Sequence, residues 1–408
     1  MAAAGLSFCL AACQLLATLH EAPLRDAGAP ASDGGLEAET GLVFGPCPTA
    51  PPPVDDPLNG ITSADMVASY LSLDVTKLPE DVKPHLCAPA GDDLDGIQTK
   101  CHDPNAPMGC VWDPTTATPP CDGPNGSDNA LSSLIGTVSS LGTLGGVGGS
   151  VAKRFDPAIY IREGLINVIF RVTQYNDLEN DPSVEVAVGV SAGITRFIPE
   201  VPSNDGPPDI SALPIVWDGE KRETWSWDTR AVDSRNEPTA QATAAYVAHG
   251  ILVADFPSAP LPLGGLSSGL PVRRARVVGN LVKRNGGYYI EHGRLTGAVR
   301  TRDLLQVIGT INGSGVPELC SPDAAALYAI AESEVCQSAD LSATKGSVCD
   351  ELSIGLSFYA VPGDIAPNPA VGRFNNTAPC DGGWVAPECA FISEWQAAHP
   401  DGGDAARD

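Results

Sequence analysis

Alternating apolar and polar positions in the middle of the chain predict several β-strands. Two such stretches, 166–172 and 184–190, flank a turn that contains Asn and Pro residues. Further strands are expected at 246–256, 275–282, 288–295 and 354–358. The dipeptide Asn285-Gly286 is the strongest short hairpin signal in the sequence. This spacing predicts antiparallel strands that are joined by short turns.

Helical spacing of apolar residues occurs in fewer places. It predicts a short helix from Ser63, a helix after the capping residue Asp128, and a helix that Pro322 opens. Many short strands with a few helices at the margins predict a mainly β fold. The expected architecture is an antiparallel β-sandwich with peripheral helices and disulfide-pinned loops.

The amino-acid composition supports a mainly β fold and excludes some classes of binding partner. The 43 glycines and 37 prolines favour turns, and no apolar run approaches the length of a membrane-spanning helix. The formal net charge of −26 argues against nucleic acid as a partner, because such a surface repels phosphate backbones. An acidic surface also suits cation binding, or solubility alone.

The first residues indicate export. Leu10-Ala11-Ala12-Cys13 follows an apolar stretch and resembles the lipobox of bacterial lipoproteins, in which the cysteine carries lipid after signal cleavage. We therefore expect a signal peptide at 1–12, a lipid on Cys13 and a membrane as partner through that lipid. The expected location is the outer membrane or cell surface, or otherwise the periplasm or the medium. The stretch has no Lys or Arg at its start, so a buried N-terminal helix stays an alternative.

The twelve cysteines predict disulfides, because a reducing cytosol rarely tolerates so many. No C-x-x-C pair occurs, which argues against structural zinc. If Cys9 leaves with the signal and Cys13 carries lipid, ten cysteines remain in two groups of five. They are Cys47, Cys87, Cys101, Cys110 and Cys121, then Cys320, Cys336, Cys349, Cys380 and Cys389. Full oxidation requires at least one bridge between the groups, unless Cys47 is free.

The expected organisation follows from these points. A tether rich in Ala, Pro, Gly and Asp spans 13–60, and a single disulfide-rich domain spans 61–400. A disordered tail spans 401–408. A bridge between the two cysteine groups brings the ends of the mature chain together, which favours one closed domain over two separate ones.

Several short motifs occur along the chain: Leu94-Asp95-Gly96, Cys101, Asp122-Gly123, Asp128-Asn129, Tyr175-Asn176, Asn180-Asp181, Cys349-Asp350, Leu352-Ser353 and Phe358. Together they resemble the motifs of a group of uncharacterised secreted proteins and lipoproteins, many of them myxobacterial. The resemblance spans about residues 87–390 and implies export and a single domain. That group has no assigned function to carry over.

Calcium is the candidate cofactor. The hard oxygen ligands Asp93, Asp95, Asp122, Asn125 and Asp128 are grouped by turns and nearby cysteines. Their spacing is not that of an EF-hand, and Asp and Asn also occur in turns for their own backbone hydrogen bonds. A second acidic group lies at 177–181.

Two further patterns bear on binding or catalysis. Residues 189–193 spell G-x-S-x-G around Ser191, the pattern of the α/β-hydrolase nucleophile, but no helical stripe follows. His249 lies on an apolar strand face and is expected in the core. Trp225 and Trp227 share one strand face, which allows either core packing or stacking on a glycan or protein ligand at the cell surface.

Basic residues concentrate in one predicted hairpin. They are Arg273, Arg274, Arg276, Lys283, Arg284, Arg294, Arg300 and Arg302. Pairing with the protein's own carboxylates is the favoured interpretation, and an anionic glycan or lipid headgroup is the alternative. The leading hypothesis is a non-enzymatic, lipid-anchored envelope protein with a binding or structural role. The alternative is an exported hydrolase that uses Ser191 or a pair of carboxylates.

Overall fold

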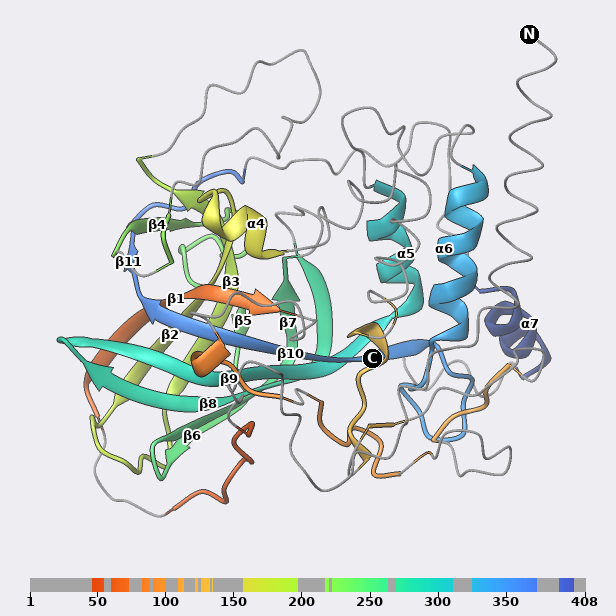
Figure 1. Cartoon of the computed structure of the whole chain (residues 1–408), viewed down its shortest axis with the longest axis horizontal. Helices are drawn as coiled ribbons and strands as arrows, with labels where there is room; N and C mark the ends of the chain where they lie inside the picture. The colour runs from red at the N-terminus through yellow and green to blue at the C-terminus, as the bar shows by residue number, and fades with distance from the viewer. Residues whose placement is uncertain are drawn as a thin grey trace, which may run out of the picture. The chain divides into compact units, whose positions relative to one another are not determined.

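The computed structural model describes residues 46–54, 60–72, 83–88, 91–97, 99, 109–113, 122–123, 126–132, 134, 157–196, 217–219, 222–262, 269–310, 325–372 and 389–399 (Figure 1). These residues belong to one compact unit, Phe44–Asp408. The predicted signal peptide, Cys13 and the tail at 401–408 lie outside the described residues. No described helix is long and apolar enough to cross a membrane.

The fold is mainly β and mostly antiparallel, which confirms the predicted class. Within the described residues, eleven strands form one sheet in the order β11-β4-β3-β2-β1-β10-β9-β8-β7-β6, with β5 paired to β3. Their bounds are β1 Thr62–Ser72, β2 Asn167–Tyr175, β3 Glu185–Ile194, β4 Thr224–Trp227, β5 Ala240–Gln241, β6 Ala244–Ala248, β7 Ile251–Leu261, β8 Leu270–Arg284, β9 Gly287–Arg300, β10 Glu351–Pro362 and β11 Asp364–Ile365. Among these strands, only the pairing of β11 with β4 is parallel.

The described strands form one sheet, and the expected two-layer sandwich is not confirmed. The sheet curls so that β6 reaches the segment just before β3. Asp181 and Val247 exchange two backbone hydrogen bonds of 2.8 Å, and the Val184 N–H donates to the Ala245 carbonyl at 3.1 Å. The carboxyl-terminal part of β3 pairs with β4 instead. A sandwich and a curled sheet both bury one face of each strand, so alternation alone does not separate them.

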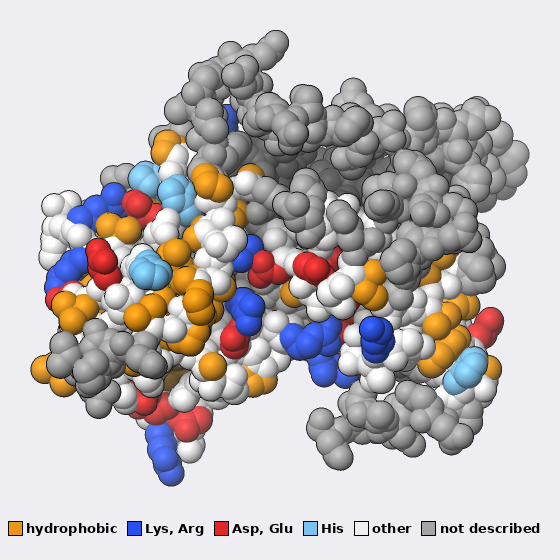
Figure 2. All heavy atoms as spheres, turned by 90° about the horizontal axis from the view of Figure 1, so that it is seen from below, with side chains coloured by type: hydrophobic (Ala, Val, Ile, Leu, Met, Phe, Trp, Pro, Cys, Tyr) orange, Lys and Arg blue, Asp and Glu red, His pale blue; other side chains and the backbone are white. Residues whose placement is uncertain are grey.

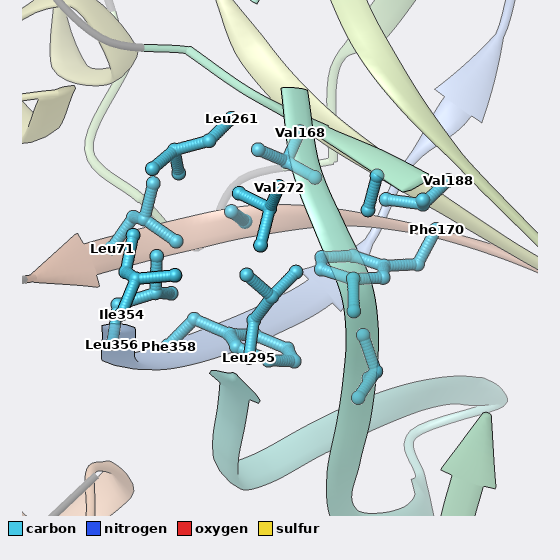
Figure 3. Packing of buried hydrophobic residues seen from close by; sticks show 14 of the residues in the cluster. Leu71, Val168, Phe170, Val188, Leu261, Val272, Leu295, Ile354, Leu356 and Phe358 are labelled. Carbon is cyan, nitrogen blue, oxygen red and sulfur yellow. The ribbon is translucent and has the colours of Figure 1, made fainter. Parts of the chain in front are cut away.

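The space enclosed by the curled sheet is filled with apolar side chains (Figure 3). Side chains from seven strands meet there: Leu71, Val168, Phe170, Val188, Leu261, Val272, Leu295, Ile354, Leu356 and Phe358. The rings of Phe170 and Phe358 stack with centroids 4.7 Å apart. Each such side chain contributes about 1.5–3 kcal/mol when it is fully buried. This interior is the main core of the fold.

The first strand was predicted as a helix, and that prediction is wrong. β1 lies between β2 and β10 in the middle of the sheet. Met66, Val67 and Ala68 are all buried, so the strand has apolar side chains on both faces and lacks a clear alternation. Periodicity cannot separate a short, fully buried strand from a helix.

Two tight turns define the hairpins. Asn285 and Gly286 take φ values of 52° and 78°, as a two-residue type I′ turn requires, so the predicted hairpin is confirmed. His249 and Gly250 take φ values of 54° and 73° and divide the expected strand 246–256 into β6 and β7. His249 is therefore exposed at a turn, and its expected place in the core is wrong.

Helices occupy the margins, as predicted. They are the 3-10 helix η2 Lys83–His85, α4 Pro157–Arg162, α5 Thr301–Thr310, α6 Ala325–Gln337 and α7 Ala390–Ala398. α6 is the helix that Pro322 predicts. Residues 130–132 and 134 are helical, in agreement with the helix expected after Asp128.

The described residues contain three disulfides, and one of them joins the two cysteine groups as predicted. Cys110–Cys349 spans 239 residues of sequence, and Cys336–Cys389 ties α6 to the segment before α7. Cys101, Cys121, Cys320 and Cys380 lie outside the described residues. Disulfides of this kind persist outside the reducing cytosol, so they indicate a non-cytoplasmic protein.

The third bridge, Cys47–Cys87, shortens the predicted tether. The Tyr246 hydroxyl also donates to the Pro51 carbonyl at 2.6 Å. Cys47 is therefore not free, and the bond and the Pro51 contact attach the described residues 46–54 to the domain.

Candidate metal centre

The outer face of β9 and β10 is polar, and a loop-rich cap buries it. We define the cap as the described residues within 87–132 and 338–350. Along β10, Ser353 and Ser357 alternate with the inward apolar residues and are completely buried. The Ser357 hydroxyl donates to the Cys87 carbonyl, and the Ser353 hydroxyl accepts from the Ala130 N–H at 2.8 Å. Hydrogen bonds thus take the place of apolar contacts on this side of the sheet.

The Asn129 amide is the central contact between the cap and the sheet. Its Nδ2 donates to the Gly355 carbonyl at 3.0 Å, and its Oδ1 accepts from the Gly355 N–H at 2.9 Å. The side chain thereby completes backbone hydrogen bonding of β10 where no neighbouring strand does so. Because Asn129 follows Asp128 directly, this contact also fixes the position of the acidic group.

Three carboxylates of the cap come together. One carboxylate oxygen each from Asp93, Asp95 and Asp128 lies within 4.8 Å of the other two. Asp93 is exposed, Asp95 is half-buried and Asp128 is 3% exposed. These are three of the five predicted calcium ligands, and the fold places them at one point although 33 residues separate Asp95 from Asp128.

The loop 93–97 is shaped by the carboxylates that it carries. Asp93 Oδ1 accepts from the Gly96 N–H at 2.7 Å, and Asp95 Oδ1 accepts from the Ile97 N–H at 2.8 Å. Asp128 Oδ2 accepts from the Leu94 N–H at 2.7 Å, which ties the two segments. This is the turn chemistry that the sequence offered as the alternative to metal binding. The two interpretations are compatible, since a carboxylate has two oxygens.

Asp122, the fourth predicted ligand, lies next to this cluster. Its Oδ2 accepts from the Thr99 N–H at 2.5 Å, and its carboxyl group hydrogen-bonds to that of Asp128. Two carboxyl groups can share such a hydrogen bond only when one of them holds a proton. The fifth candidate, Asn125, lies outside the described residues.

Burial and mutual repulsion raise the pKa values of these acids. Burial is the main reason that the pKa of Asp128 is raised to about 8; the neighbouring charges of Asp340, Asp122 and Asp95 also raise this pKa, whereas the hydrogen bond from the Leu94 N–H lowers it. The pKa values of Asp122 and Asp95 are also raised, chiefly by burial. The cluster therefore holds its negative charge at a free-energy cost near neutral pH.

Asp340 is a further acid of this region that sequence reasoning missed. It accepts hydrogen bonds from the Ser353 N–H at 2.7 Å and from the Ser353 hydroxyl at 2.5 Å. Burial still raises its pKa to about 7. Asp340 is distant from the other acids in sequence, and the Cys110–Cys349 bridge brings its segment to the cap. Nothing in the local pattern around residue 340 signals this.

The donor set fits a hard divalent cation. Calcium takes carboxylate and carbonyl oxygens from irregular loops, whereas zinc and copper prefer nitrogen and sulfur ligands. Gly109 leaves room for this arrangement, because a Cβ at that position would lie 2.5 Å from Asp95 Oδ2. A cation between these carboxylates would offset both their repulsion and their lost hydration.

Ser191 does not lie in the setting of a hydrolase nucleophile. It is 0% exposed in β3 and pairs with Asn167 of β2. Its hydroxyl donates to the Ser226 carbonyl at 2.9 Å and accepts from the Gly193 N–H at 3.0 Å. The chain continues as a strand to Ile194, whereas a nucleophile elbow turns at once into a helix.

Trp225 and Trp227 are core residues. Their side chains are 0% and 3% exposed, and Trp225 packs edge-to-face against Trp217 with centroids 5.0 Å apart. Arg171 lies over the Trp227 ring at 5.6 Å. Buried rings give no exposed platform for a ligand, so the structure places this pair in the packing role that was the alternative to binding.

Seven of the eight basic residues singled out in the sequence form ion pairs with the protein's own carboxylates, as favoured from the sequence; they lie in β8, β9 and α5. On the face in Figure 2, Lys and Arg side chains lie beside Asp and Glu side chains. The ion pairs are Arg273–Glu351, Arg274–Glu351, Arg276–Asp255, Lys283–Asp177, Arg284–Glu291, Arg294–Asp92 and Arg302–Asp303. The second acidic group is likewise used structurally, since Asp181 accepts from the Asn176 N–H at 2.7 Å.

Several of the motifs that resemble those of the secreted proteins meet in the cap. Leu94 contacts Asp128, Asn129 contacts Gly355, and Ser353 lies between Ala130 and Asp340. Comparisons with protein-family models, with curated proteins and with solved structures found no match to this chain. The function therefore has to be argued from the geometry of the site alone.

Proposed function

We propose that this protein is an exported, lipid-anchored envelope protein with a structural or binding role, and that calcium stabilises its cap. The single observation that carries calcium is the convergence of Asp93, Asp95 and Asp128, with carboxylate oxygens within 4.8 Å of one another. A cation held there would join the segment of Asp93 and Asp95 to the segment of Asp128, which the hydrogen bond from the Leu94 N–H to Asp128 also ties.

The raised pKa values of the acids support this proposal. Without a cation, Asp122 and Asp128 share a hydrogen bond, and the pKa of Asp128 is about 8 because of its burial. Calcium would replace that proton and supply the missing positive charge. Binding should therefore release a proton and should weaken as the pH falls, as for any site whose ligands must be deprotonated.

A structural or binding role is favoured over catalysis by the placement of the candidate groups. Ser191 is buried in a strand, and the interior of the curled sheet is occupied by apolar side chains rather than by a cleft. The disulfides support export, and the lipobox-like segment ending at Cys13 supports a lipid anchor. We therefore favour a non-enzymatic envelope protein.

Calcium titration of the oxidised protein tests the cation. Calcium at about one hundred times its dissociation constant should stabilise the fold by about 2.7 kcal/mol, measured as a shift in thermal unfolding at pH 7.5. Asp95→Asn and Asp128→Asn should abolish the shift. Gly109→Ala should weaken it without removing any charge, because the added Cβ displaces the Asp95 carboxylate.

Glu237→Gln provides the matched control, because it removes one exposed carboxylate far from the cap in sequence and should leave the calcium response unchanged. Calorimetry in buffers of different ionisation enthalpy should show proton release. If the wild-type protein shows no stabilisation at millimolar calcium, the range of weak extracellular sites, the calcium proposal is wrong.

Intact mass of the natively expressed protein tests the anchor separately. We expect loss of residues 1–12 and a mass increase from lipid on Cys13, and Cys13→Ala should retain neither the lipid nor membrane association. A mass that includes Met1 and no lipid would exclude the anchor while leaving the calcium proposal untouched.

A further inference from the structure

A cavity of about 200 Å³ lies beside the acidic cluster, where the cap meets β8. Its charged lining comes from Asp95, Arg274 and Lys345, and its apolar lining includes Leu94, Ile97 and Leu341. The volume is smaller than the roughly 300–1,000 Å³ of pockets for drug-sized molecules. It therefore suits a small ligand with both a charged group and an apolar part.

The backbone of Arg274 is built in an unusual conformation at this cavity. Arg274 has a φ of 47°, in the left-handed region that non-glycine residues rarely adopt. The register of β8 and β9 shifts between Arg273 and Arg276, as at a β-bulge. Bulges redirect side chains and often lie beside functional sites, and left-handed non-glycine residues concentrate there too.

A completely buried carboxylate holds the Arg274 guanidinium in place. Glu351 is 0% exposed, and its Oε2 accepts from Arg274 Nη2 at 2.7 Å. The same carboxylate pairs with Arg273 at 3.4 Å. The guanidinium groups of Arg273 and Arg274 share the one carboxylate of Glu351, so these three side chains together carry a net charge of about +1, which attracts an anionic ligand.

We propose that this cavity binds a small organic monocarboxylate. The carboxylate of the ligand lies between Arg274 and Lys345, and its apolar part packs against Leu94, Ile97 and Leu341. Arginine matches the geometry of a carboxylate with two parallel donors, and lysine adds a point charge. Asp95 on the same wall repels a dianion such as sulfate more strongly than a monoanion, which favours a single negative charge.

This inference goes beyond the proposed calcium role and does not depend on it. Arg274 and Lys345 carry their charges without a cation in the cluster. The binding experiment is therefore done in the presence of a chelator, so that a failure of the calcium proposal leaves it unaffected. Binding that occurs only after calcium is added would overturn the assignment to Arg274 and Lys345.

Titration of the oxidised full chain with butyrate and benzoate, followed by NMR or calorimetry, tests the proposal. We expect saturable binding with a dissociation constant of about 1 mM. Benzamide, the neutral analogue of benzoate, and sulfate should bind at least about tenfold more weakly. Equal binding of benzamide, tighter binding of sulfate, or no saturation by either carboxylate would each overturn the proposal.

Two substitutions assign the binding to these side chains. Lys345→Gln removes an exposed charge and should weaken benzoate binding about tenfold. Arg274→Asn should do the same while keeping the fold, because asparagine tolerates the left-handed conformation and Arg273 still pairs with Glu351. Arg222→Gln, which alters an exposed arginine paired with Asp364, is the control and should bind as wild type. Unchanged affinity in Lys345→Gln would refute the assignment.

Discussion

The inward and outward faces of β10 are buried by different means. Ile354, Leu356 and Phe358 point into the curled sheet, where only apolar contacts surround them (Figure 3). Ser353 and Ser357 point into the cap, where they hydrogen-bond to its backbone and to the Asp340 carboxylate. The Cys110–Cys349 disulfide lies in the same cap. The stability of the inward face depends little on solution conditions, since burial of apolar area is insensitive to pH and redox state. The stability of the outward face depends on both pH and redox state.

This difference divides the molecule into two parts: the curled sheet, whose stability changes little with solution conditions, and the cap, whose stability depends on them. The curled sheet can persist when the cap loosens, because its core is enclosed by its own strands. The described residues of the cap form only a small apolar cluster of their own, made by Cys110, Ala339 and Cys349. We therefore expect the cap to depend on the Cys110–Cys349 bridge, on Asn129 and on the charge state of its acids. Changes to each part should therefore have distinguishable effects.

The largest effect is expected on the inward face. Phe358→Ala removes a ring that stacks on Phe170, and should lower the free energy of unfolding by about 3–5 kcal/mol in denaturant titration. The loss should be the same at pH 5 and pH 8. Val371→Ala, at a position that is 63% exposed, is the control and should change stability by less than about 0.5 kcal/mol. A loss below about 1 kcal/mol for Phe358→Ala would contradict a close-packed interior.

The next effect is expected from the Cys110–Cys349 bridge, which joins the two segments of the cap. Joint replacement of Cys110 and Cys349 by serine should cost about 2–5 kcal/mol, because it frees a long loop in the unfolded chain. Hydrogen exchange should accelerate in the cap but not in β2 and β3. The matched control replaces Cys336 and Cys389 and should leave exchange in the cap unchanged. Uniform acceleration over the whole sheet would mean that the cap and the core are one cooperative unit.

A smaller effect is expected from pH. Burial raises the pKa of Asp128 to about 8 and that of Asp340 to about 7, so the folded state binds more protons than the unfolded state between pH 4 and these values. The metal-free protein should therefore lose stability as pH rises from 5 to 8, by about 1 kcal/mol or more. Asp128→Asn should reduce this slope, and calcium should restore stability at pH 8 if the proposed site binds it. Rising stability over this range would contradict the raised pKa values.

The sequence predicts local features such as turns and strands better than it predicts which distant strands pair to close the curled sheet. The turn Asn285-Gly286 could be predicted because two left-handed residues in succession admit few dipeptides. The strand around Phe170 could be predicted because its apolar residues alternate. The meeting of β6 with the segment just before β3 could not, because backbone hydrogen bonds between distant segments leave no mark on the side-chain pattern.

Only some residues of the candidate metal site could be predicted from the sequence. Asp93 and Asp95 could be selected because they are neighbours in a turn-rich, cysteine-rich segment. Asp340 could not, because its approach depends on a bridge whose partner was unknown. Counting cysteines did predict that one bridge must cross between the groups, since parity does not depend on geometry. The sequence could not decide the role of Trp225, because an aromatic residue on a strand has the same pattern whether its ring faces the core or a ligand; its ring is in fact buried.

The bond between Cys47 and Cys87 decides where tension on the amino-terminal segment enters the fold. Without it, a pull would reach β1 first at Thr62 and would peel that strand from its neighbours one hydrogen bond at a time. With it, the load passes to residue 87, which Ser357 fastens to β10 near the middle of the sheet. The strand β1 then lies outside the direct path of that load, and one covalent bond sets the point at which the sheet first receives it.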